Sequence, residues 1–297
     1  MSRTSFDQFS KQFLEEFLTP LGEVQTNREV PGEPRFIDIF FAPSTQPSEE
    51  FLMLGLLGKI VTTPCLIEPF RNQPSPTEVR SCLFKLLFVQ ADFQRKARRE
   101  DERISEVNLP QLWILAPSAS ESLLNGFGAR LREDWLPGVY FLANFLKTTI
   151  IAINQLPRTE ETLWVRLLGK GATQKQAIEE ILALPSEDSR RSKALRLLTS
   201  WKISMEVSGA IDEEDRDLLM TLSPAYLQWE QETERLAMQR GQRLVVENLL
   251  KVRFGALDEQ LSAIIPTLLE LPAEEYTRLL LQLSREELLS QFQHPTS

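Results

Sequence analysis

One segment of this 297-residue chain constrains its fold more than any other: Arg35 to Ala42, which reads RFIDIFFA. It is rich in aromatic and β-branched residues and has prolines on both sides, which is typical of a β-strand. Its one acid, Asp38, stands inside an apolar run. Because an unpaired buried carboxylate is costly, Asp38 needs either a charged or hydrogen-bonding partner or a position that a cation can reach.

The segments around this strand predict an α/β domain. A helix is expected over 5–18, where phenylalanines recur at helical spacing after Ser5, a suitable N-cap. Strands are predicted at 23–27, 35–42, 63–70 and 110–116, with two more within 138–153. Further helices are predicted at 49–60, 77–103 and 119–131. We therefore expect a mixed sheet flanked by helices, ending near Pro157.

From Thr159 onward the sequence shows helical periods and no convincing strand. The expected helices cover 160–169, 173–184, 188–207, 212–220, 224–254, 257–271 and 273–292. We divide the chain into an α/β domain (1–157), a helical linker region (158–240) and a small C-terminal helical module (241–297).

The composition is that of a soluble globular protein, with 42% hydrophobic and 25% charged residues. No apolar run approaches the ~20 residues needed to cross a bilayer, and the N-terminus lacks the apolar region of a signal peptide. Cys65 and Cys82 lie in apolar surroundings, which favours reduced thiols and a cytoplasmic location. The net charge of −9 repels polyanions. Any contact with DNA must therefore be local or bridged by metal ions.

Histidine chemistry is excluded by a single observation: the only histidine is His294, close to the C-terminus. Ser-His-Asp and Cys-His catalysis and histidine-ligated zinc are therefore not expected. If the chain is an enzyme, its chemistry must rest on carboxylates, lysines and a hard cation.

A second acid has the same character as Asp38. Glu68 ends the next buried strand, after Leu66 and Ile67. Two carboxylates on neighbouring strands can converge on one Mg²⁺, which prefers oxygen ligands and can activate a water molecule. The alternatives are structural: Asp38 paired with an arginine or a backbone donor, and Glu68 at a strand end set by Pro69, where it reaches solvent.

Together these features resemble the PD-(D/E)XK nuclease superfamily, in particular its recombination-promoting nuclease and putative-transposase branch. The resemblance covers the order of elements from about 5 to 153 and is anchored by the strand that bears Asp38. It implies a restriction-endonuclease-like fold and a Mg²⁺-dependent phosphodiesterase. Asp38 would be the first metal ligand and Glu68 the second, and Glu15 or Glu16 on the first helix would add an outer ligand.

A second resemblance covers roughly 241–292. There, RLVVENLLKVRFG at 243–255 and LLLQL at 279–283 resemble a small helical module often appended to those nucleases. The module has no assigned chemistry, so its value lies in occurring together with the first resemblance.

The chain departs from the family pattern in its second motif. The family has lysine or glutamine two residues after the glutamate, whereas this chain has Phe70. Arg71 is one residue late and on the opposite face of a strand. Lys85, on the following helix, is the residue that would supply the lost charge. The 30-residue interval from Asp38 to Glu68 indicates an insertion, such as the helix at 49–60.

Candidate DNA contacts are Arg71 and a basic cluster near the end of the helix at 77–103. The cluster comprises Arg95, Lys96, Arg98 and Arg99. The alternatives are that Arg71 pairs with an acid, and that the cluster is compensated by the acids at 100–102 on a solvated helix end.

Two functions follow from the sequence. The first is a nuclease-like protein, in an active or a degenerate form, acting on DNA with Mg²⁺. The second is a non-catalytic scaffold or regulatory protein that binds a protein partner through its helical region. A homo-oligomer is compatible with both, and no membrane partner is expected.

Overall fold

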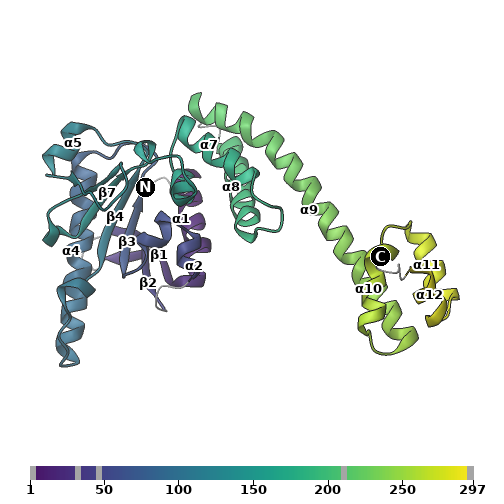
Figure 1. Ribbon diagram of the computed structural model, residues 1–297. Coiled ribbons are helices and arrows are strands. Elements are labelled where there is room, and N and C mark those ends of the chain that lie inside the picture. Colours follow the sequence, from purple (N-terminus) through teal and green to yellow (C-terminus); the bar gives the residue numbers. More distant parts are fainter. Residues whose placement is uncertain (1–4, 31–34, 45–48, 209–212, 293–297) are drawn as a thin grey trace. The chain divides into compact units, whose positions relative to one another are not determined.

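The computed structural model describes residues 5–30, 35–44, 49–208 and 213–292 (Figure 1). The chain forms two compact units, Met1–Tyr226 and Leu227–Ser297. The first contains the sheet and its surrounding helices, and the second is helical. The expected fold class, a mixed sheet flanked by helices and followed by an all-helical region, is confirmed.

One seven-stranded sheet forms the centre of the first unit, with the strand order β1-β2-β3-β4-β7-β6-β5. The strands are β1 (Gly22–Val30), β2 (Arg35–Pro43), β3 (Cys65–Pro69), β4 (Gln111–Ala116), β5 (Arg130–Leu131), β6 (Val139–Phe141) and β7 (Thr148–Ala152). Strands β3, β4 and β7 are parallel to one another, while the β1–β2, β2–β3, β5–β6 and β6–β7 pairs are antiparallel. Both residues of β5 are exposed, which explains why no apolar pattern predicted that strand.

Helix α4 (Pro76–Arg99) covers one face of the sheet (Figure 1). It starts at a capping box in which the Ser75 hydroxyl accepts from the Glu78 N–H and the Glu78 carboxylate accepts from the Ser75 N–H. Its apolar side packs on inward-facing residues of four strands. The core there includes Phe40, Leu66, Val79, Cys82, Leu86, Val89, Leu112, Ile114 and Ile150.

Helix α1 (Ser5–Leu18) lies on the other side of the sheet, as its phenylalanine spacing predicts (Figure 1). Its outer side packs against α6 (Leu163–Arg166) and α8 (Ser189–Ser208), and α7 (Gly171–Leu182) contacts both of these helices. Phe9 stacks on Trp201 of α8 with ring centroids 4.5 Å apart, and Phe17 meets Trp164 of α6 at 4.9 Å. The start of the expected linker region thus belongs to the first compact unit.

The helix predicted at 49–60 is two short helices, α2 (Glu49–Met53) and α3 (Leu56–Ile60). Gly55 separates them with a φ of +54°, a conformation that L side chains rarely adopt. A Cβ at this position would lie 2.2 Å from the Glu161 carbonyl oxygen. The prediction of one continuous helix is therefore wrong, because the chain turns at Gly55. Helix α5 (Glu121–Gly126) lies within the predicted range.

The second unit contains α9 (Glu213–Phe254) from Leu227 onward, followed by α10 (Glu259–Leu268), α11 (Ala273–Gln282) and α12 (Arg285–Phe292). Helix α9 is continuous where a break near 220–224 was predicted. The unit has its own apolar core, made by Val246, Leu250, Leu261, Ile264, Ile265, Leu268, Tyr276, Leu280, Leu288 and Leu289. Among the described helices, α9 included, we find none long and apolar enough to span a membrane.

Candidate active site

Strand register places the two predicted acids side by side. The antiparallel β2–β3 pair aligns Ile39 with Ile67 and Phe40 with Leu66. One step further along the same register sets Asp38 opposite Glu68. Directly opposed residues share a face, with Cβ atoms about 4.5–5.5 Å apart. The Asp38 N–H donates to Glu68 Oε1 at 3.4 Å, so the two acids occupy one site.

Lys85 reaches this site from α4. Its Nζ lies 2.7 Å from Glu68 Oε2, and the two side chains are 12% and 2% exposed. Cys82 and Leu86, on either side of Lys85 along α4, face the core of the sheet. The packing of α4 on the sheet therefore places the Lys85 ammonium group beside Glu68. A lysine therefore stands beside the second acid even though the strand itself carries Phe70.

A second lysine approaches from α1. Lys11 Nζ lies 2.8 Å from Asp38 Oδ1 and 2.9 Å from Asp7 Oδ1, and it donates to Asn27 Oδ1 at 3.0 Å. The sequence analysis missed Lys11. The only sequence signal was its position four residues after Asp7, the usual spacing of an ion pair on one helix face.

Asn27 is held by an irregularity in β1. The β1–β2 ladder pairs Thr26 with Ile39 and Arg28 with Ile37. Between these pairs Asn27 has a φ of +53°, a left-handed conformation that asparagine tolerates better than most residues. Its side-chain amide oxygen accepts from Lys11. The strand therefore supplies a neutral acceptor that fixes the lysine beside Asp38.

Burial controls the protonation of this cluster. Burial and the neighbouring Asp38 carboxylate raise the pKa of Glu68 to about 8, against the opposing effect of Lys85. Burial disfavours the charged form of Lys85, but Glu68, Cys82 and Asp38 together outweigh burial and raise the lysine pKa. For Lys11, burial is likewise outweighed by hydrogen bonds to Asp38 and Asp7, which raise its pKa. Burial and Asp38 thus favour the protonated form of Glu68, while both lysines are held in their charged form.

Two carboxylates of the cluster are the candidate ligands for a hard cation. The described residues contain no group of three or more histidine, cysteine, aspartate or glutamate side chains that could hold a metal. A cation would therefore bind Asp38 and Glu68 alone, with water completing its shell, which is how Mg²⁺ is commonly held. Each lysine contacts one oxygen of its acid, Asp38 Oδ1 or Glu68 Oε2, which leaves lone pairs on the other. The Asp38 side chain is 24% exposed, so water has access.

Glu15 and Glu16, the expected outer ligands, line a different site. Glu16 forms an ion pair with Arg196 of α8. Both acids border a cavity of about 400 Å³ between α1 and α8. Glu16 follows Lys11 by five residues, which turns it about 140° around the helix. The structure thus gives the position near Asp38 to a lysine instead of a glutamate.

Arg71 joins elements of the fold. Its Nη1 donates to the Gly169 carbonyl and to Gln174 Oε1, both at 3.0 Å. Its guanidinium lies 5.1 Å from the Phe6 ring centroid and 5.2 Å from that of Trp201. These contacts connect the chain after β3 to α1, α7 and α8, which gives Arg71 a structural role.

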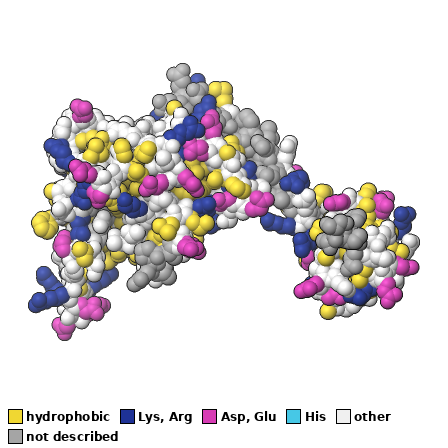
Figure 2. Space-filling model, viewed as in Figure 1, with side chains coloured by type: hydrophobic (Ala, Val, Ile, Leu, Met, Phe, Trp, Pro, Cys, Tyr) yellow, Lys and Arg dark blue, Asp and Glu magenta, His cyan; other side chains and the backbone are white. Residues whose placement is uncertain are grey.

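The basic cluster at the end of α4 is exposed. Figure 1 shows α4 extending past the sheet, and Figure 2 shows basic and acidic side chains mixed on this end. Arg95 and Lys96 form ion pairs with Asp92 at 3.5 and 3.3 Å. Their own side chains are 55% and 59% exposed. Arg98 and Arg99 are also exposed. Four cations are therefore available to solvent, partly compensated by neighbouring acids.

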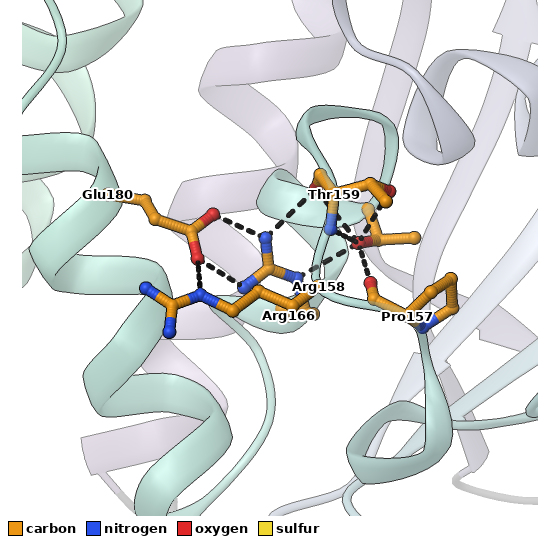
Figure 3. Close-up of polar contacts among 6 residues, drawn as sticks. Pro157, Arg158, Thr159, Arg166 and Glu180 are labelled. Carbon is orange, nitrogen blue, oxygen red and sulfur yellow. Dashed lines mark hydrogen bonds and ion pairs between the residues drawn. The ribbon is translucent and has the colours of Figure 1, made fainter.

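A second buried polar cluster joins α6 to α7 (Figure 3). Arg166, 1% exposed, donates to Glu180 Oε1 at 3.1 Å and to the Thr159 carbonyl at 2.9 Å. It also pairs with Glu180 Oε2 at 2.5 Å, and Arg158 contacts the same carboxylate at 2.6 Å. Because Arg166 is buried and its contacts connect α6 to Glu180 of α7 and to Thr159, we assign this cluster to stability.

No protein-family model, curated protein or solved structure matched the chain when each was searched. The chemistry of the Asp38–Glu68–Lys85–Lys11 cluster is therefore the basis for inferring a function.

Proposed function

We propose that the chain is a nuclease-like protein whose first unit hydrolyses phosphodiester bonds in DNA with Mg²⁺ held by Asp38 and Glu68. The observation that carries the proposal is the position of Lys85, 2.7 Å from Glu68 on the strand next to Asp38. The carboxylates of Asp38 and Glu68 are suitable ligands for a hard cation, and the Lys85 ammonium group beside them can attract a phosphate.

Each residue has a distinct task in this proposal. Mg²⁺ would activate a water molecule and stabilise the leaving phosphate oxygen. Asp38, the more exposed acid, presents an oxygen toward solvent, while the buried Glu68 is fixed by Lys85 and by the Asp38 N–H. The Lys85 ammonium orients Glu68 and provides a positive charge close to the reacting phosphate. Glu68 must lose its proton when the cation binds.

The basic end of α4 supports contact with a DNA backbone. Lys96 and Arg99 follow Lys85 by 11 and 14 residues, so they lie within about 40° of its helix face. They are about 16 and 21 Å further along the helix axis. A phosphate backbone running along α4 would meet both, which gives the local attraction that a chain of net charge −9 requires.

The test is cleavage of supercoiled plasmid by the purified full chain with Mg²⁺ or Mn²⁺. We expect cleavage that requires the metal, and a loss of at least about 100-fold in Asp38→Ala and in Lys85→Met. Lys175→Met, an exposed lysine on α7, is the matched control and should retain full activity. Cleavage that survives Asp38→Ala would refute the site assignment.

A non-catalytic scaffold is the second candidate, favoured by one observation. Asp38 and Glu68 each already have a lysine within 2.8 Å, so the cluster is electrostatically satisfied without a cation. In that case it would serve only the stability of the first unit. A folded wild-type protein that neither binds a divalent cation nor cleaves DNA would favour this function.

A further inference from the structure

We infer that Lys11 is a built-in cation that restricts this site to one divalent metal ion and holds Asp38 in position. The inference rests on the proposed function, since it concerns the metal bound by Asp38 and Glu68. It makes Lys11 a positioning residue and the determinant of metal stoichiometry.

The geometry fixes Lys11 at Asp38. An ammonium group has three donors, and Lys11 has three acceptor residues: Asp38 at 2.8 Å, Asp7 at 2.9 Å and Asn27 at 3.0 Å. The Lys11 side chain is only 12% exposed. Moving it away would leave these acceptors without their shared donor, so the ammonium group is held on the α1 side of Asp38.

That position is where a second cation would need to bind. A second metal ion at Asp38 would have to use Oδ1 or approach it closely, and Lys11 Nζ already lies 2.8 Å from this atom. Glu16, the outer carboxylate expected to support another ion, pairs with Arg196 instead. The nearby Asp7 carboxylate is itself paired with Lys11. Lys11 therefore occupies the space and supplies the charge of that ion.

The charge balance leads to the same conclusion. With all groups ionised, the carboxylates of Asp7, Asp38 and Glu68 exceed the ammonium groups of Lys11 and Lys85 by one negative charge. One divalent ion leaves the cluster with a single positive charge, whereas two would leave a triple positive charge in a largely buried site. Coulomb repulsion at such short separations is large, so the second ion is strongly disfavoured.

The test is the number of Mn²⁺ ions bound per full-length chain, measured by titration calorimetry and by electron paramagnetic resonance without DNA. We expect one ion for the wild type and for Lys11→Arg, which keeps the charge.

Lys11→Glu replaces the cation with a carboxylate beside Asp7 and Asp38 and should bind two ions. Lys11→Gln should bind the first ion at least about tenfold more tightly than the wild type, because one repulsive charge is lost. Lys175→Glu, which makes the same charge change on exposed α7, should bind one ion.

The outcomes separate this inference from the proposed function. A wild type that binds two ions overturns the role of Lys11 and leaves the nuclease proposal standing, and so does a folded Lys11→Glu that binds one. A folded wild type that binds none overturns the metal site itself. If Lys11→Glu does not fold, as judged by circular dichroism, the wild-type stoichiometry and the affinity of Lys11→Gln still decide.

Discussion

At the scale of single residues, Glu68 determines how stability depends on pH. Its pKa is raised from 4.5 to about 8 in the folded chain by burial and by Asp38. The folded state then binds more protons than the unfolded state between these values, so the free energy of unfolding should fall as pH rises from about 4.5 to about 8.

Urea denaturation at several pH values across that interval measures the effect. Glu68→Gln cannot titrate, so its free energy of unfolding should lose this slope, whatever its absolute stability. The raised pKa values of Lys11 and Lys85 start from 10.5 and act above this interval. A wild type whose stability rises with pH between about 5 and 8 would contradict the protonated state of Glu68.

The same proton should make metal binding dependent on pH. A cation at Asp38 and Glu68 must displace the Glu68 proton, because a ligand oxygen competes with H⁺. We therefore expect the apparent affinity for Mn²⁺ to rise by up to about tenfold per pH unit below pH 8 and to level off above it. Calorimetry in two buffers of different ionisation enthalpy should show nearly one proton released per ion at pH 7. Proton release that is absent at pH 7 would show that Glu68 is already ionised.

At the scale of secondary-structure elements, the Arg166–Glu180 pair should hold α6 and α7 together. Hydrogen bonds from Arg166 lower the pKa of Glu180, against the effect of burial and with help from Arg158. Because this carboxyl pKa is depressed, its contribution to stability is present above the unfolded value of 4.5 and is lost as pH falls through the folded value.

Arg166→Met should lower the free energy of unfolding by about 1.5–3 kcal/mol at pH 7, the range for hydrogen bonds to charged groups. We expect this value instead of a larger one because Glu180 is 24% exposed and remains partly hydrated. The loss should shrink below pH 4. Arg130→Met, on exposed β5, is the control and should change stability little. An Arg166→Met variant as stable as the wild type would show that the pair is not a structural link.

The elements also show what the sequence could predict. Helix α1 has the predicted bounds because six of its 14 residues are buried phenylalanines or leucines on one apolar face, and periodicity alone defines such a helix. Asp38 and Glu68 were predicted to converge, and Lys85 was predicted as a relocated lysine, since strand neighbours and a following helix are constrained by topology. Lys11 was missed because its partners, Asn27 and Asp38, lie on strands 16 and 27 residues away, and only the packing of α1 on the sheet brings them together.

At the scale of the whole molecule, the two compact units have separate cores and should unfold separately. The core of the second unit includes Leu268, and that of the first includes Leu112, both 0% exposed. Calorimetry of the full chain should show two transitions, and fragments 1–226 and 227–297 should each reproduce one.

Leu112→Ala and Leu268→Ala should each lower the free energy of unfolding of their own unit by about 2–5 kcal/mol. Each should leave the other transition unchanged, because the two leucines belong to different buried clusters of the described residues. If either substitution shifts both transitions, the units fold as one cooperative body, and the cation site would then depend on the helical unit as well as on its own sheet.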